Sequence, residues 1–171
     1  MKHFTMDSLK ELLVYIFFDD EDKGNELVVP LTNSFLTPMN KENVYTDTYI
    51  GYIIDRVKVD STAVLEKSHI DRRVVYDVHL GFFGKDSELW ANECLFLPMR
   101  KDINEKLSEY PAVINNKGLE IYSEPYIQEG LSSTVIWIVK LRISGVAFVD
   151  IDEQEELKSV KGATGSIIIE Q

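Results

Sequence analysis

The sequence predicts an α+β fold in which an antiparallel or mixed β-sheet is packed by one or two helices, with a long C-terminal strand and an extended tail. Three observations predict it: strict alternation over 74–82, helical spacing of apolar residues around Pro98, and a long apolar strand over 134–151. The chain has 171 residues, of which 44% are hydrophobic and 27% charged, as expected for one globular domain. We therefore expect a single domain over 1–151 and a tail or arm over 152–171.

A helix is expected near the start of the chain. Thr5 or Asp7 can cap it, and its pattern ends near Phe18. Its apolar face has the i, i+3, i+4, i+7 spacing and comprises Leu9, Leu12, Leu13 and Ile16. The acidic run that follows, residues 19–22, has the composition of a solvated loop.

Strand segments follow this helix. Residues 26–31 predict a short strand that Pro30 confines to a sheet edge or a strand end, because proline cannot donate a ladder hydrogen bond. Residues 32–43 have loop composition. Residues 45–59 predict one long strand or two joined ones, with a bend or bulge at Gly51.

The strand over 74–82 has the clearest pattern in the chain. Residues 60–70, which precede it, are turn-like or poorly patterned, and no strand is assigned to them. The alternation assigns one set of side chains to the core: Val74, Tyr76, Val78, Leu80 and Phe82.

A helix capped by Asp86 or Ser87 is expected next. Trp90, Cys94 and Leu97 share one of its faces. Pro98 either kinks this helix or lies in the first turn of a second one. Helical spacing then continues to Pro111 through Met99, Ile103, Leu107 and Tyr110.

Two further strands close the domain. Leu119, Ile121 and Ile127 alternate with polar residues, and Pro125 marks this strand as an edge or a bulge. The last strand, 134–151, would span on the order of 60 Å at about 3.3 Å per residue, which is unusually long. We expect either that Gly145 breaks it or that part of it leaves the domain and pairs elsewhere.

The chemical inventory predicts no active site. His3, His69 and His79 lack the spacing of a metal motif, and Cys94 has no second cysteine to pair with. The glycine-rich segment at 162–166 lacks the lysine of a phosphate-binding loop. We therefore expect no catalytic residue, no cofactor and no metal, and hence a protein that is not an enzyme.

Charge and hydropathy narrow the possible partners. The formal net charge of −11 argues against binding nucleic acid phosphates, which requires clustered Lys and Arg. Asp7 and Glu11 interrupt the apolar run that a secretory signal would need, and no segment has the length of a membrane span. The expected protein is soluble and intracellular in origin.

The order of the expected elements resembles the tail-terminator, or neck and tail-completion, proteins of tailed bacteriophages over roughly residues 6–150. The resemblance is carried by an N-terminal helix, antiparallel strands closing with Val74 to Phe83, the helix with Trp90-Ala91-Asn92-Glu93-Cys94-Leu95 that ends near Tyr110, the segment Gly118-Leu119-Glu120-Ile121, and the long strand Thr134 to Val149. This family has no diagnostic sequence motif. The segments 19–43 and 151–171 are not evident family features.

The resemblance implies a virion structural protein, made in the host cytoplasm. It would form a homo-oligomeric ring, usually of six subunits, that joins the tail tube to the head-to-tail connector around a DNA channel, without specific DNA binding and without a membrane. Acidic loops facing that channel would repel the passing DNA. The expected oligomer or partner contacts are Trp137, Lys140, Arg142, Ile167, Ile168 and Ile169. Core packing of Trp137 and a solvated sheet face for Lys140 and Arg142 are the alternatives.

Three other functions are compatible with the sequence. One is another connector or tail tube subunit of the same apparatus. The second is an acidic monomeric module that mimics DNA or binds a basic partner through its charge of −11. The third, a small hydrolase, would need a clustered polar pocket that the sequence does not indicate.

Overall fold

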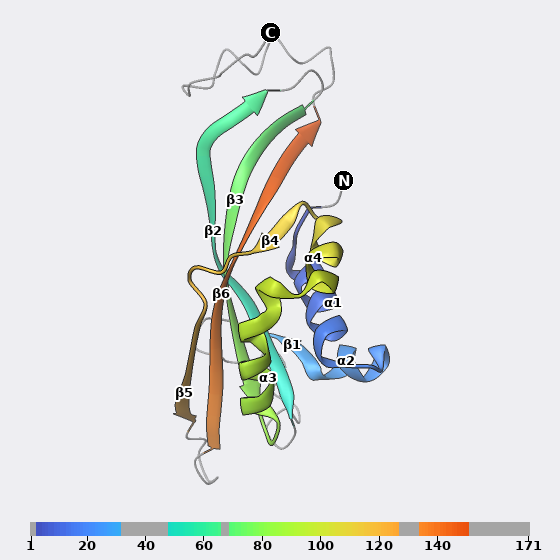
Figure 1. Ribbon diagram of the computed structural model, residues 1–171, viewed down its shortest axis with the longest axis vertical. Helices are drawn as coiled ribbons and strands as arrows, with labels where there is room; N and C mark the ends of the chain where they lie inside the picture. The colour runs from blue at the N-terminus through green and yellow to red at the C-terminus, as the bar shows by residue number, and fades with distance from the viewer. Residues whose placement is uncertain (1–2, 32–47, 66–68, 127–133, 151–171) are drawn as a thin grey trace.

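The computed structural model describes residues 3–31, 48–65, 69–126 and 134–150, and these form an α+β fold, as the sequence predicts (Figure 1). The helices are α1 (Met6–Phe17), α2 (Glu21–Leu27), α3 (Ser87–Glu93), the 3₁₀ helix η1 (Cys94–Met99) and α4 (Lys101–Ser108). The strands are β1 (Val28–Pro30), β2 (Tyr49–Leu65), β3 (His69–Phe83), β4 (Ala112–Ile114), β5 (Glu120–Tyr126) and β6 (Thr134–Asp150). The proposed C-terminal tail, 152–171, and the expected loop at 32–43 lie outside the described residues.

The sheet is mixed and is built around β6. Its order is β1-β2-β3-β6-β4, and β5 pairs with β6 along a different part of the same edge. Only the β1–β2 pair is parallel; β2–β3, β3–β6, β4–β6 and β5–β6 are antiparallel. The strand that comes last in the sequence is therefore central in the sheet.

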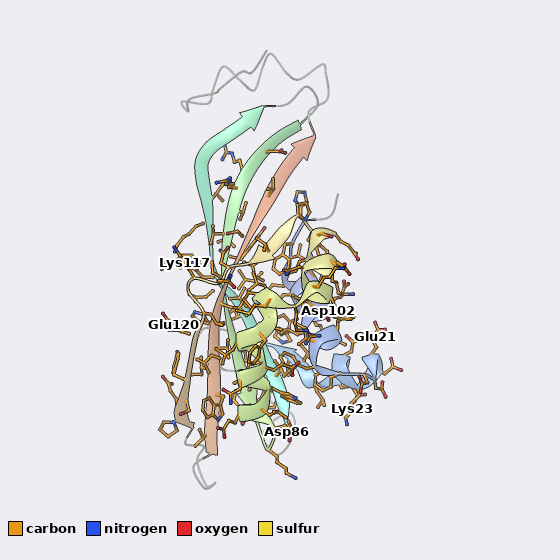
Figure 2. The ribbon with its side chains drawn as sticks, viewed as in Figure 1. Glu21, Lys23, Asp86, Asp102, Lys117 and Glu120 are labelled. Atoms are coloured by element: carbon orange, nitrogen blue, oxygen red, sulfur yellow. The ribbon has the colours of Figure 1, made fainter. Side chains whose placement is uncertain are left out.

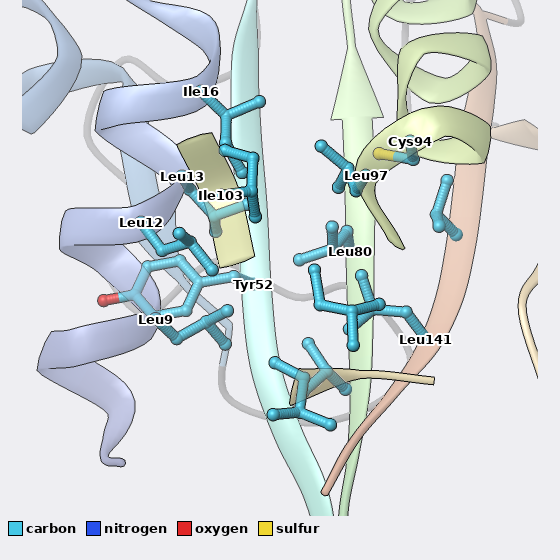
Figure 3. Close-up of a cluster of buried hydrophobic side chains, with 14 of the residues drawn as sticks. Leu9, Leu12, Leu13, Ile16, Tyr52, Leu80, Cys94, Leu97, Ile103 and Leu141 are labelled. Carbon is cyan, nitrogen blue, oxygen red and sulfur yellow. The ribbon is translucent and has the colours of Figure 1, made fainter. Parts of the chain in front are cut away.

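The helices cover one face of this sheet, which we call the helix face. Apolar side chains of α1, α3, η1 and α4 bury themselves against β2, β3 and β6, while α2 packs on α1. Burying one such side chain fully contributes about 1.5–3 kcal/mol. Figure 3 shows this core, with Leu9, Leu12, Leu13, Ile16, Tyr52, Leu80, Cys94, Leu97, Ile103 and Leu141 labelled. The five alternating β3 residues expected in the core are all buried there.

The first helix is confirmed, with Thr5 as its cap. The Thr5 hydroxyl accepts a hydrogen bond from the Ser8 amide at 3.3 Å, and the Ser8 hydroxyl accepts one from the Thr5 amide at 3.3 Å. This reciprocal capping box satisfies two backbone donors that the first helical turn leaves unpaired.

The acidic run at 19–22 was expected to be a loop, and this prediction was wrong in part. Asp20 caps α2, because its carboxylate accepts hydrogen bonds from the amides of Asp22 and Lys23. Glu21 and Asp22 then lie in the first turn, where the helix dipole favours negative charge. A short strand follows, as expected, but it is limited to Val28–Pro30 at the sheet edge.

Pro98 interrupts the expected helix, and the spacing of apolar residues did not show the kind of interruption. Proline donates no backbone hydrogen bond and obstructs the preceding turn of an α-helix. Here Pro98 lies inside the 3₁₀ helix η1, and α4 begins afterwards, at Lys101. The tighter turn turns Met99 outward, so its expected alignment with buried Ile103 is wrong.

The turn-like interpretation of 60–70 is wrong for most of its length, since β2 continues to Leu65 and β3 begins at His69. The pairing is interrupted between Ile54 and Arg56 and again between Val59 and Ala63. Such bulges bend a strand and increase its twist, as Figure 1 shows in the curved upper part of β2.

Gly51 is not the bend that was expected in β2. It pairs regularly with Gly81, and a Cβ at this position would lie 2.6 Å from Leu31 Cδ2. The glycine is therefore needed for the close approach of Leu31 to the sheet.

β6 runs unbroken through Gly145 and leaves the helix-covered body. It pairs with β3 continuously from Trp137 opposite Phe82 to Asp150 opposite His69. In the part of the chain that the structure describes, β2, β3 and β6 continue beyond the helices (Figure 1). We call this extension, residues 60–65, 69–73 and 146–150, the arm. β4, which was not expected, pairs with β6 at the base of the arm, from Ile143 to Gly145.

Two glycines with positive φ provide a matched test of the fold. Gly84 (φ 88°) and Gly118 (φ 95°) both occupy the left-handed region, where a Cβ is unfavourable. A Cβ on Gly84 would lie 2.6 Å from Thr48 Cα, whereas the nearest atom to one on Gly118 would be 3.7 Å away.

We expect Gly118→Ala to lower the free energy of unfolding by about 1 kcal/mol, the conformational cost alone. Gly84→Ala should cost roughly 2–3 kcal/mol, because the Thr48 backbone must also move. Urea denaturation of both variants measures the difference. Equal losses would contradict the close packing of Gly84 against Thr48.

Candidate functional site

The two faces of the sheet differ in character. The helix face is apolar and covered, whereas the opposite face, which we call the open face, has no helix among the described residues packed on it (Figure 1). Near the lower end of β3 and β6 the open face holds a second, smaller apolar cluster, consisting of Leu31, Tyr49, Phe83, Ile136 and Ile138. Tyr49 and Phe83 stack there with ring centroids 4.1 Å apart.

Further up, the open face carries a polar network centred on Asp77. Arg142, directly opposite on β6, donates a hydrogen bond from Nε to Asp77 Oδ1 at 2.9 Å. Lys58 Nζ lies 3.0 Å from Asp77 Oδ2. The hydrogen bond from Arg142 is the main reason why the pKa of Asp77 lies below its ordinary value, with Lys58 lowering it further. The ion pairs of Asp77 therefore link β3 to both β2 and β6.

His79 is the next residue on the open face of β3. Burial is the main cause that lowers its pKa; nearby Lys140 lowers it as well, whereas Asp55 and Asp77 act in the opposite direction. The neutral imidazole is therefore the favoured form in the folded protein.

Of the six expected contact residues, the three in the described part of the chain, Trp137, Lys140 and Arg142, do not share one face of the sheet. Lys140 and Arg142 lie on the open face, where Lys140 Nζ is 5.2 Å from the Tyr122 ring centre and 4.0 Å from Glu120 Oε2. Trp137 is half-buried on the helix face, packed against the main core. Ile167, Ile168 and Ile169 lie outside the described residues. Figure 2 shows Glu120 at the β5 edge of the sheet, away from the helices.

The sequence analysis missed an exposed apolar ridge on the opposite side of the molecule. It runs along α3 and η1 and consists of Leu89, Leu95, Phe96 and Met99. Phe96 is 60% exposed and Met99 76% exposed. In a 3₁₀ helix residues i and i+3 lie one above the other, which aligns Phe96 with Met99. The spacing of these two residues was visible in the sequence, but its outward direction follows from the 3₁₀ turn.

Three features of the described residues bear on catalysis: the cysteine, the grouping of possible metal ligands, and one hollow. Cys94 is fully buried, and burial raises the pKa of its thiol, which opposes thiolate formation. Among the described side chains no group of three or more His, Cys, Asp or Glu residues is placed to hold a metal ion. A hollow of about 290 Å³ between α1, α2 and α4 is lined by Glu11, Val14, Tyr15, Phe18, Asp19, Glu21, Asn25 and Lys106. Its lining contains no Ser, Thr, Cys or His that a neighbouring base could activate for nucleophilic attack.

No protein-family model and no curated protein matches this chain. In the described part of the chain, none of the helices combines the length and apolar character needed to cross a membrane.

The ion pair between Asp77 and Arg142 predicts a loss of stability in acid. The pKa of Asp77 is depressed in the folded state, so its contribution is present above the unfolded value of about 4 and is lost as pH falls through the lower folded value. Asp77→Asn should lower the free energy of unfolding by about 1 kcal/mol at pH 7, and this difference should shrink towards pH 3. Urea denaturation at a series of pH values measures it.

A double-mutant cycle tests whether the two groups act together. Arg142→Gln should produce much of the same loss, and the double variant should lose less than the sum of both. Lys101→Gln is the control, because Lys101 lies 3.5 Å from Glu105 in a solvated pair and should contribute little. Strict additivity of the Asp77 and Arg142 losses would show that the pair is not coupled.

Proposed function

We propose that this chain is a non-enzymatic structural subunit of a tail-terminator or neck ring in a tailed bacteriophage, where it joins the tail tube to the head-to-tail connector. The order of helices and strands that suggested this family is the support from the sequence. The geometric support is the arm, which extends three strands beyond the helices. The working parts of such a subunit are its contacts with neighbours.

The arm carries the proposal because it leaves sheet edges available. β1 pairs with β2 only from Ile50 to Tyr52, so within the described residues no strand pairs with the outer edge of β2 beyond this point. An uncovered strand edge is a template for pairing with another chain. Ordering three strands far from the core costs conformational entropy. Contacts with a neighbouring subunit would offset this cost.

The charge of the chain agrees with a subunit that lines a DNA passage. The net charge is −11, and the exposed acidic start of α2 concentrates negative charge at Asp19, Asp20, Glu21 and Asp22. Such a surface repels DNA phosphates and would let DNA pass without binding.

The same acidic helix start favours one alternative, an acidic monomeric module that binds a basic partner. Exposed carboxylates ordered on a helix are compatible with that function. The two proposals differ in the mass of the free protein, because the module needs no second copy.

Light scattering of the purified protein tests the ring. We expect a mass near six times the 19.6 kDa of one chain, with particles that show a central opening by negative-stain electron microscopy. Deleting residues 152–171 should weaken the assembly if the tail contributes to subunit contacts. A strict monomer at all concentrations would contradict the ring and favour the acidic module.

A further inference from the structure

Over most of its length, the outer edge of β2 has no paired strand among the described residues. β1 pairs with this edge only from Ile50 to Tyr52, and the Leu31 amide adds one hydrogen bond to the Tyr52 carbonyl at 2.9 Å. β2 then continues to Leu65. An open edge of this length is a site for strand addition, and folded proteins commonly cover such edges because they otherwise pair with other chains. The edge is therefore a place where a further strand can bind.

The helix layer covers β3 beside this edge but stops before β2. Val57 pairs with Tyr76 and Val59 pairs with Val74, so all four side chains lie on the helix face. Tyr76 and Val74 are buried in the main core, whereas Val57 is 51% exposed and Val59 is 53% exposed. A strand added along the edge would lie beside these two valines and would cover them if its own helix-face side chains were apolar.

The same edge of a second copy does not fit this position. Arg56 pairs with Asp77 and Lys58 pairs with Val75, so both basic side chains lie on the open face. If two copies paired these edges about a two-fold axis, Arg56 and Lys58 of one copy would lie opposite the same residues of the other. Like charges directly opposite on paired strands are destabilising. The strand that covers this edge therefore comes from a different part of the sequence.

The C-terminal segment 166–170, which lies outside the described residues, has the matching pattern. It reads Ser-Ile-Ile-Ile-Glu, and β-branched residues favour extended strands. Because side chains alternate along a strand, Ile167 and Ile169 share one face, and Ile168 and Glu170 share the other. With the first pair beside the exposed valines, Glu170 lies on the same face as the two basic residues of β2.

The end of β6 brings this segment within reach of the edge. β2 and β6 run in the same direction, since each is antiparallel to β3, so the chain leaves β6 at Asp150 at the end of the arm. Val59 is aligned through Val74 with Gly145, which is about 17 Å from Asp150 along the strand at ~3.3 Å per residue. Residues 151–166 can span up to about 50 Å. A tail that turns back from Asp150 would run antiparallel to β2 and can reach its outer edge.

We propose that residues 166–170 add to the outer edge of β2 of their own chain as an antiparallel strand, with Ile167 and Ile169 beside Val57 and Val59. Attachment to the same chain keeps the effective concentration of the segment high, which favours this edge over the edge of another copy. The inference does not depend on the ring. It adds a form of regulation to the proposed function, because a subunit contact through this edge must first displace the tail.

Cysteine cross-linking of the full chain tests the position of the tail. A chain with Val59→Cys and Ile169→Cys is treated in dilute solution with a short bis-maleimide; native Cys94 is buried and is retained. The matched control carries Val113→Cys with Ile169→Cys. Val113 is 48% exposed and pairs with Ser144, so it lies about as far from Asp150 as Val59 does, but on β4. Linkage within single chains should be at least about tenfold more frequent from position 59 than from position 113.

The other outcomes of this experiment overturn the inference. Equal linkage from positions 59 and 113 would show a tail without a preferred position. Linkage from position 59 only between different chains would show that the tail covers the edge of another copy, and absence of linkage would show that it covers neither. The mass of the unlinked protein by light scattering decides on the ring separately.

Hydrogen exchange of the β2 amides gives a second readout. Ile169→Asp places a charge beside Val57 and Val59, so amides at 53–59 should exchange at least about tenfold faster than in the wild type. Ile168→Asp is the matched control, because its carboxylate would lie on the open face with Arg56 and Lys58 and should leave exchange close to wild type. Unchanged exchange in Ile169→Asp, or equal acceleration in both variants, would overturn the inference.

Discussion

The pairing of β3 with β6 is the constraint on which the rest of the molecule depends. It runs without interruption from Phe82 opposite Trp137 to His69 opposite Asp150, through both the body and the arm. Since side chains alternate along each strand, this one register decides which of them meet the helices and which form the open face. If β6 slipped by one residue along β3, Arg142 would move from the open face to the apolar helix face and lose Asp77 as its partner.

The sheet is longer than the layer of helices that covers it. This difference in length determines which part of the sheet is left without a helix. The cover formed by α1, α3, η1 and α4 ends where β4 joins β6, whereas β2, β3 and β6 continue. On the helix face at this junction, Val57 and Val59 of β2 therefore remain exposed. The 3₁₀ turn around Pro98 has a related effect on the other layer, since it turns Phe96 and Met99 away from the core. In both places apolar side chains are exposed because the packing between the helices and the sheet ends beside them.

Most of the fold could be predicted because, in the segments with the clearest sequence pattern, the spacing of apolar residues matches the residues that are buried. The alternation over 74–82 and the spacing of α1 both hold, since each buries one regular face. The arm could not be read from 60–70, because β2 is ordered there by pairing with β3, and β3 by pairing with β6, while the pairing of β2 is interrupted between Val59 and Ala63. The ridge was missed because a 3₁₀ turn rotates side chains relative to the α-helical spacing assumed for Met99.

The central place of β6 also governs when the protein can fold. This strand is synthesised last, after every other described element, yet β3, β4 and β5 all depend on it for pairing. A chain emerging from the ribosome can form α1 and the β2–β3 hairpin early. Until β6 is made, however, β3 lacks its second neighbour, and β4 and β5 have no strand to pair with. Contacts between such distant segments form slowly, and the partly made sheet exposes apolar strands meanwhile. Truncation before Thr134 should therefore leave a fragment prone to aggregation instead of a smaller domain.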